Sequence, residues 1–171
     1  MSLRNLLHCA AALVALSCAT ISHAQLKVGD TFPAFTPNGV VSLSGAPAPA
    51  TAGQVVLVDF WASWCAPCKA SFPALAKIHT DFAPRGLVLA AVSIDEKPAA
   101  AVTFAKKLAP PFATLHDREQ KLVKQVVVPT MPTSYLVDRS GKIRFIHEGF
   151  HGDATDKLLR TQLETLLAEK L

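Results

Sequence analysis

The chain has 171 residues, of which half are hydrophobic, and its 17 basic residues exceed its 13 acidic residues by four. This length and composition fit one globular domain with a full-sized core. The lysines are scattered along the chain and form no basic stripe, so the composition gives no support for nucleic-acid binding.

Residues 1–24 are predicted to be a secretory signal. Arg4 supplies a positive charge, residues 6–19 are mostly apolar, and the Ser-His-Ala sequence at 22–24 has small residues where a signal peptidase reads. The apolar segment is shorter than the ~20 residues that span a bilayer, which favours cleavage after residue 24 over an uncleaved membrane anchor. The mature domain, residues 25–171, is therefore expected in the periplasm.

Cleavage would leave one pair of cysteines. Cys9 and Cys18 would leave with the signal, so that Cys65 and Cys68 would be the only sulfur atoms able to form a disulfide. A domain stabilised by structural disulfides would carry more cysteines at wider separations. The remaining Cys-x-x-Cys pair is therefore interpreted as a redox-active dithiol.

The first part of the mature chain is rich in turn signals. Apolar segments at 32–35 and 40–43 flank an Asn-Gly pair at 38–39, which predicts a small N-terminal β-hairpin. Alternating Ala and Pro at 46–52 predict a loop. The valine-rich segment 54–62 then predicts a strand buried on both faces, in the interior of a sheet.

The buried strand leads directly into a predicted helix at 66–82, where apolar residues recur every three or four positions. Pro73 lies inside this helix and predicts a kink. A second strand is expected at 87–94 and a second helix at 97–108, which a Pro-Pro pair terminates.

The remaining elements are a short helix at 117–125, two strands of a hairpin at 133–137 and 143–147, and an amphipathic helix at 154–171. Alternation of strands and helices favours parallel pairing through helical crossovers, and the late hairpin adds antiparallel strands. The prediction is one α/β sandwich around a mixed sheet.

The helix start provides the conditions for thiol chemistry. Unpaired backbone N–H groups and the helix dipole favour a thiolate at Cys65, and the thiolate is the reactive form. Cys65 is predicted to attack a partner's disulfide, and Cys68, one turn further along the same face, to resolve the mixed disulfide. Asp59 is the candidate proton acceptor, because burial raises the pKa of a carboxyl group; the alternative is a capping role at the end of the strand.

Several motifs resemble the thioredoxin superfamily. They are Val-Asp-Phe-Trp-Ala-Ser-Trp-Cys-Ala-Pro-Cys-Lys at 58–69 and Pro73. Gly-Asp-x-Phe-Pro-x-Phe at 29–35, Ala-Ala-Val-Ser-Ile-Asp at 90–95 and Tyr-Leu-Val-Asp-x-x-Gly-Lys-Ile at 135–143 resemble the TlpA/ResA-like exported thiol-disulfide oxidoreductases. This resemblance implies a three-layer thioredoxin-like sandwich and a protein-disulfide oxidoreductase that needs no cofactor beyond its disulfide.

The resemblance also implies a substrate-binding surface. Pro132 would be a cis-proline facing the disulfide, and the backbone of Met131 would pair with an extended substrate segment. Trp64 and Pro67 would contribute to the same surface, while Trp61 would lie in the core.

Two positions depart from the pattern of these relatives. Ser71 stands where members involved in cytochrome c maturation often have Glu, and Asp59 stands where many relatives have Asn. Apocytochrome c, copper-site cysteines and other protein thiols therefore all stay open as substrates. An Ala-Pro pair between the cysteines with a buried Asp favours reduction, which outside the cytoplasm requires a membrane electron donor of the DsbD/CcdA type. A monomer is expected.

Other functions could use the same cysteines. A structural zinc site would need more ligands at zinc-finger spacing, whereas copper delivery would need only the two cysteines and a histidine. A thiol peroxidase is disfavoured because residues 60–64 contain neither the Pro nor the Thr of the peroxidatic motif. A non-enzymatic assembly module would not need the thiols. His116, His147 and His151 are expected to be surface or loop residues, and no metal site is predicted.

Overall fold

The computed structural model describes residues 24–45 and 47–170. The predicted signal segment, including Cys9 and Cys18, lies outside the described residues except for Ala24. Within the part of the chain that is described, no helix is both long enough and apolar enough to cross a membrane.

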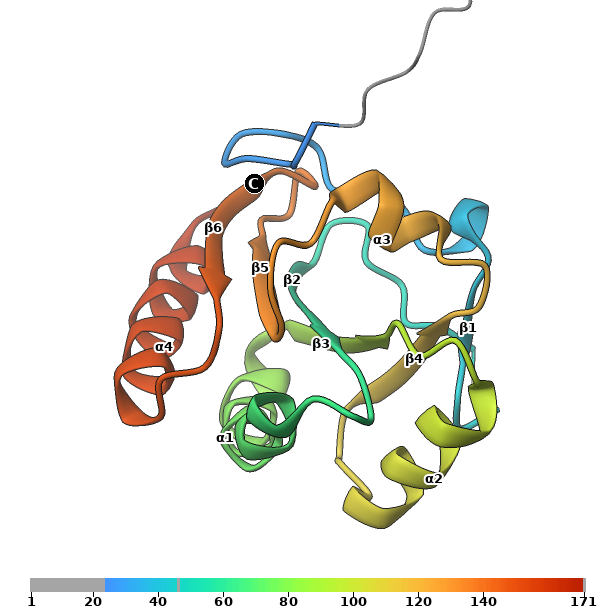
Figure 1. The fold of residues 1–171 in the computed structure, drawn as a ribbon. Helices are drawn as coiled ribbons and strands as arrows, with labels where there is room; N and C mark the ends of the chain where they lie inside the picture. The colour runs from blue at the N-terminus through green and yellow to red at the C-terminus, as the bar shows by residue number, and fades with distance from the viewer. Residues whose placement is uncertain (1–23, 46, 171) are drawn as a thin grey trace, which may run out of the picture.

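A six-stranded mixed sheet forms the centre of the domain, with the strand order β1-β4-β3-β2-β5-β6 (Figure 1). The strands are β1 (Val40–Ser42), β2 (Val55–Trp61), β3 (Leu87–Ser93), β4 (Ala113–Asp117), β5 (Thr133–Val137) and β6 (Ile143–Glu148). The neighbours β2, β3 and β4 run parallel, while β1, β5 and β6 pair antiparallel with their neighbours. The prediction of a mixed sheet in an α/β domain is confirmed.

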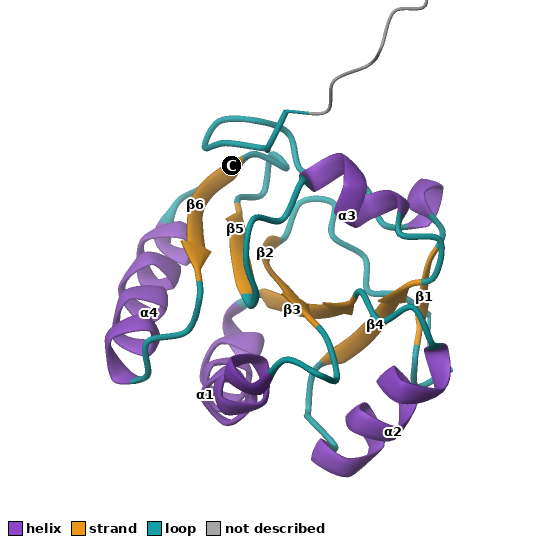
Figure 2. Cartoon of the chain, in the orientation of Figure 1, coloured by secondary structure: helices purple, strands orange, loops and turns teal. Residues whose placement is uncertain are grey.

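Helices cover both faces of the sheet (Figure 2). They are α1 (Ala66–Phe82), α2 (Pro98–Leu108), α3 (Lys121–Val126) and α4 (Asp153–Ala168), with two short 3-10 helices at Thr36–Asn38 and Ala83–Arg85. Helices α1, α2 and α4 contribute to one apolar core, and α3 and the N-terminal segment contribute to the core on the opposite face. These are the three layers that the sequence predicts.

Strand β2 joins the two cores, because successive side chains of a strand point to opposite faces. Leu57 and Trp61 belong to the core under α1 and α4, whereas Val58 and Phe60 belong to the core under α3. All seven residues of β2 are buried. The continuous apolar run is thus explained by helices on both faces.

The sequence did not predict β4. Its residues Thr114, His116 and Asp117 are polar, and the strand lies between two prolines and a short helix. All three residues are nevertheless buried, and the strand lies between β1 and β3, which supply backbone hydrogen bonds. The expectation that His116 is a surface or loop residue is therefore wrong, since only 1% of it is exposed.

The two arms of the expected N-terminal hairpin attach to different strands. Val40 in β1 lies opposite Asp117 of β4, and Thr31 forms an isolated bridge with Lys142, next to β6. Residues Thr36–Asn38 form a 3-10 helix in place of a tight turn. The unpaired backbone groups at the two edges of the sheet draw the arms apart, because each edge offers hydrogen bonds that the arms would otherwise give each other.

The packing of α4 can be tested with two leucines of the same helix. Leu163 is fully buried, whereas 48% of Leu158 is exposed. We expect Leu163→Ala to lower the free energy of unfolding by about 2–5 kcal/mol, because it leaves a cavity in the core. Leu158→Ala should change it by no more than about 0.5 kcal/mol. Urea unfolding of the oxidised protein measures both, and equal losses would contradict this packing of α4.

Candidate redox site

The two cysteines lie where β2 passes into α1, and they form a disulfide with an S–S distance of 2.06 Å. Cys65 is 6% exposed, while Cys68 is fully buried in the core beneath it. Cys65 also lines the open groove described below, whereas Cys68 does not. This difference agrees with the predicted division into an attacking and a resolving cysteine.

The start of α1 is arranged to stabilise negative charge on Cys65. Cys65 occupies the N-cap position, and its Sγ accepts a hydrogen bond from the backbone N–H of Cys68 at 3.1 Å. Pro67 fits the first turn of the helix, where a missing N–H breaks no helical hydrogen bond. The N–H group and the helix dipole both favour a thiolate at Cys65 in the reduced protein.

Asp59 lies on the face of β2 that α1 covers, as do Leu57 and Trp61. The residue is 1% exposed, and its Oδ1 accepts a hydrogen bond from the hydroxyl of Ser134 at 2.6 Å. Its Oδ2 has no hydrogen-bond partner among the described residues. Burial raises the pKa of Asp59 from 3.8 to about 7, against the smaller lowering effect of the Ser134 bond. A carboxyl group with this pKa can exchange protons near neutral pH.

An open groove of about 520 Å³ lies beside Cys65. Its lining residues are Trp64, Cys65, Ala66, Pro67, Ile94, Val128, Pro129, Thr130 and Met131. The Met131–Pro132 peptide bond is cis. The structure thus brings Trp64, Pro67 and Met131 together with Cys65. Pro132, the next residue after Met131, is buried and is not among the residues that line the groove.

The two tryptophans differ as expected. Trp64 stands at the edge of the groove with 70% of its surface exposed, whereas Trp61 is fully buried and stacks on Phe104 at 4.8 Å between ring centroids. Trp64 is therefore available for contact with a partner, and Trp61 supports the core below the site.

Two residues at the site, Ser134 and Ile94, were not predicted from the sequence. Ser134 pairs with Asp59 across β5 and β2, and Ile94 forms part of the groove wall. A serine in an otherwise largely apolar strand was a signal that could have identified Ser134. Nothing in the sequence shows that Ile94, at the end of β3, would reach the groove.

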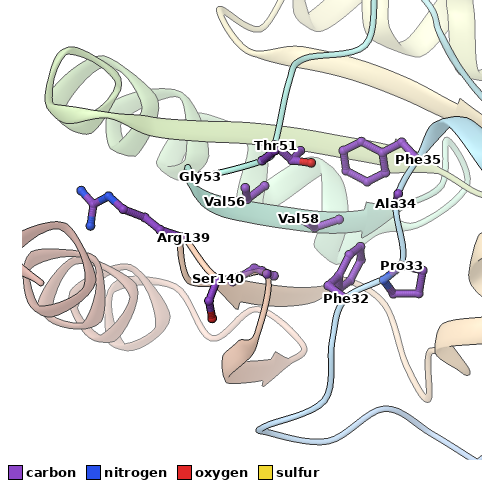
Figure 3. Close-up of a pocket in the computed structure, with 13 residues that line it drawn as sticks. Phe32, Pro33, Ala34, Phe35, Thr51, Gly53, Val56, Val58, Arg139 and Ser140 are labelled. Atoms are coloured by element: carbon purple, nitrogen blue, oxygen red, sulfur yellow. The ribbon is translucent and has the colours of Figure 1, made fainter. Parts of the chain in front are cut away.

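A second pocket, of about 260 Å³, is lined partly by Val56 and Val58 of β2 (Figure 3). These two side chains belong to the core on the sheet face opposite to the core that contains the cysteines. Phe32, Phe35, Val56 and Val58 form its apolar wall. The guanidinium of Arg139 donates hydrogen bonds to the carbonyl groups of Leu166 and Glu169 and thereby holds the end of α4. Because the guanidinium of Arg139 is engaged with α4, the pocket offers mainly apolar contacts.

The histidines occupy three different environments. His116 is buried in β4, and His151 lies in the loop before α4. The Nε2 of His147, in β6, lies 2.6 Å from Oε1 of Gln162, in α4. Across residues 24–45 and 47–170, no three or more His, Cys, Asp or Glu side chains gather in a way that could hold a metal ion.

A Cys-x-x-Cys at the start of α1, next to a cis-proline loop and above a mixed sheet, defines a thioredoxin-like protein. A family model described as the AhpC/TSA family matches residues 28–146. The chain therefore belongs to the AhpC/TSA family, and the predicted relation to ResA-like proteins is confirmed by similar sequences.

Two of these relatives are named thiol-disulfide oxidoreductase ResA. The protein from Geobacillus thermodenitrificans is 27% identical over 114 residues, which are 67% of this chain and 64% of the relative. The protein from Bacillus subtilis is 31% identical over 91 residues, which are 53% of this chain and 51% of the relative. The chain thus matches between about half and two thirds of the length of these relatives.

Solved structures show the same fold. A candidate thiol:disulfide interchange protein DsbE from Chlorobium tepidum superposes with a TM-score of 0.73 at 32% identity, covering 84% of this chain and all of the other. A secreted Mycobacterium tuberculosis disulfide oxidoreductase, homologous to E. coli DsbE, superposes with a TM-score of 0.64 at 20% identity over 74% of this chain and 94% of the other. The predicted thioredoxin-like fold is confirmed.

The raised pKa of Asp59 predicts how stability depends on pH. Between pH 3.8 and about 7 the folded protein holds a proton that the unfolded chain has released, so the free energy of unfolding falls as pH rises through this window. Asp59→Asn removes the titration, and its stability relative to wild type should rise by about 4 kcal/mol from pH 4 to pH 8. Urea unfolding of both oxidised proteins across this range measures the difference.

Ser134→Ala is the companion variant. The Ser134 hydroxyl stabilises the charged Asp59 carboxylate, so its removal should raise the pKa of Asp59 further. The fall in the free energy of unfolding should then extend to higher pH than in the wild type. A difference between Asp59→Asn and wild type that is constant from pH 4 to pH 8 would contradict the raised pKa.

Proposed function

We propose that this protein is an exported thiol-disulfide oxidoreductase that exchanges its Cys65–Cys68 dithiol with protein substrates, mainly as a reductase. The observation that carries the proposal is the unequal burial of the two cysteines at the start of α1. Cys65 borders an open groove, while Cys68 lies in the core under it. The names of the ResA relatives and of the DsbE candidate support the same class of reaction.

The reaction begins in the dithiol form. The Cys65 thiolate attacks one sulfur of a partner's disulfide, and the partner's other sulfur leaves as a thiolate. Cys68 then loses its proton and attacks the Sγ of Cys65, which forms the Cys65–Cys68 bond and releases the second sulfur of the partner. Two electrons have passed from the protein to the partner, which is now a dithiol.

Asp59 is proposed to accept the Cys68 proton in the second step. It faces the layer that contains Cys68, and burial raises its pKa to about 7, so its carboxylate form is a base matched to neutral pH. Ser134 holds one carboxylate oxygen and leaves Oδ2 for the proton.

The groove is proposed to bind an extended segment of the substrate. Its walls are largely apolar and include Trp64, Pro67 and Met131. Backbone pairing beside Met131 would fix the segment without selecting its sequence, as strand addition does at a sheet edge. Apocytochrome c and proteins with copper-site cysteines are candidate substrates because both present reducible cysteine pairs.

The cellular setting forms part of the proposal. The composition of residues 1–24 supports export to the periplasm. A reductase there needs electrons from the cytoplasm, so we propose a membrane donor of the DsbD/CcdA type that reduces the Cys65–Cys68 disulfide again. The protein is proposed to act as a monomer, without nucleic acid and without a cofactor.

Cysteine variants test the order of attack. Cys68→Ser should accumulate mixed disulfides on Cys65, because the resolving step is lost. Cys65→Ser should accumulate none, since Cys68 is fully buried. Incubating each reduced variant with insulin and with a periplasmic extract, followed by non-reducing gels and mass spectrometry, measures the adducts. Adducts on Cys68, or wild-type consumption of peroxide as fast as disulfide exchange, would contradict the proposal.

The reduction potential tests the direction of electron flow. We expect a value nearer to the roughly −270 mV of strong reductants than to the roughly −120 mV of strong oxidants. Equilibration with glutathione redox buffers, read from the Cys65–Cys68 disulfide by mass spectrometry, provides the measurement. A value at the oxidising end would mean that the protein donates its disulfide instead.

A further inference from the structure

Cys65 is held at the end of a tight turn. The backbone N–H of Cys65 donates a hydrogen bond to the carbonyl of Ala62 at 3.1 Å, which leaves Ser63 and Trp64 at the corners of the turn. Trp64 is 70% exposed. Because the exposed Trp64 has little to hold it, Ser63 is the corner of the turn that can be anchored, and this anchor helps to set the position of Cys65 at the start of α1.

The anchor is Asp95, which follows the end of β3 and is 3% exposed. Its Oδ2 accepts a hydrogen bond from the backbone N–H of Ser63 at 2.9 Å, and its Oδ1 accepts one from the Ser63 hydroxyl at 2.6 Å. The hydroxyl of Ser93 also donates to Oδ2, at 2.7 Å. The buried Asp95 carboxylate thus binds both the main chain and the side chain of Ser63.

The backbone at Ile94 and Asp95 accepts hydrogen bonds from side chains in β4 and at the start of α3. The Nε2 of His116 lies 2.8 Å from the carbonyl oxygen of Asp95, and because a carbonyl only accepts, this nitrogen carries the proton. The side-chain amide of Gln120 donates to the carbonyl of Ile94 at 2.8 Å. Gln120 adopts this position with a φ of 54°, a left-handed conformation that is costly for a residue other than glycine.

The same network reaches two residues that line the groove beside Cys65. Ile94 lines the groove beside Cys65, and its backbone N–H donates to the carbonyl of Trp61 at 2.9 Å. Trp64 follows Ser63 directly and lines the same groove. A shift of Asp95 would therefore move the nucleophile and the groove wall together.

We propose that Asp95 is a positioning residue for thiol-disulfide exchange, which acts through Ser63 to fix Cys65 and Trp64, with His116 and Gln120 as its support. The inference rests on the proposed function. Asp95 does not contact the reacting sulfur in this assignment. It holds the turn so that the Cys65 sulfur stays aligned with the start of α1 and with the groove.

The chain contains a matched control. Asp138 accepts hydrogen bonds from the backbone N–H of Ser140 at 2.9 Å and from its hydroxyl at 2.6 Å, the same two distances as for Asp95 and Ser63. This second pair lies in the loop between β5 and β6. Because Val137 lies opposite Val56, at the start of β2, the loop is at the end of the sheet away from Cys65.

The test compares Asp95→Ala, Asp95→Asn, Ser63→Ala and Asp138→Ala. In the reduced proteins we measure the second-order rate constant for attack on insulin, the pH profile of Cys65 alkylation by iodoacetamide, and stability in urea. Asp95→Ala should lower the rate constant about tenfold or more, as expected when a reacting group is misplaced. It should also change the alkylation profile, which a purely structural role would leave unchanged.

The other variants should follow in order. Asp95→Asn should lose less than Asp95→Ala, since its amide oxygen can still accept from the Ser63 N–H. Adding Ser63→Ala to Asp95→Ala should cause little further loss, because both act through one contact. Asp138→Ala should leave the rate constant and the alkylation profile at wild-type values, even where it lowers stability.

Two outcomes would overturn the proposal. One is an Asp95→Ala protein with wild-type exchange and alkylation; the other is an equal loss in Asp138→Ala. Should Asp95→Ala fail to fold, Asp95→Asn and Ser63→Ala give the same comparison. A wild-type protein that does not attack insulin would count against the proposed function, while the alkylation profiles would still decide the role of Asp95.

Discussion

The burial of β2 on both faces is the constraint on which the rest of the site depends. Because helices cover one face and the N-terminal segment with α3 covers the other, Asp59 is removed from water and its pKa rises to about 7. The same packing places Cys68 inside the core where β2 ends. Cys65 lies at the rim of this core and lines the groove, whereas Cys68 does not, so a partner in the groove meets Cys65 first.

The site lies at the carboxyl ends of three parallel strands, where α/β folds commonly place their functional residues. The Cys65 turn follows β2, Asp95 follows β3, and His116 lies near the end of β4. Parallel pairing brings these ends to one edge, which allows a hydrogen-bonded chain from β4 through Asp95 to Ser63. The polar residues that appear isolated in the sequence thus form one connected support for the turn.

Most of the elements could be predicted because their signals are local. The buried strand at Val55–Trp61 and the helix at Ala66–Phe82 follow from an apolar run and from helical periodicity. Strand β4 could not be predicted in this way. The backbone of β4 is satisfied by β1 and β3, and the His116 ring by the carbonyl of Asp95, and these partners are distant in sequence. The Asp117 carboxylate accepts hydrogen bonds from the backbone N–H groups of Lys121 and Val123 at the start of α3.

The type of chemistry at the site follows from local features of the amino-acid sequence. One Cys-x-x-Cys at a strand-to-helix junction, with an acidic residue in the strand before it, predicts thiol exchange because helix ends stabilise thiolates and burial raises carboxyl pKa values. The atoms that hold these groups in place are known only from the folded arrangement of the strands. Ser134 bonds Asp59 across 75 residues of chain, and Asp95 bonds Ser63 across 32. Hydrogen bonds over such separations depend on strand order and register, which local periodicity does not encode.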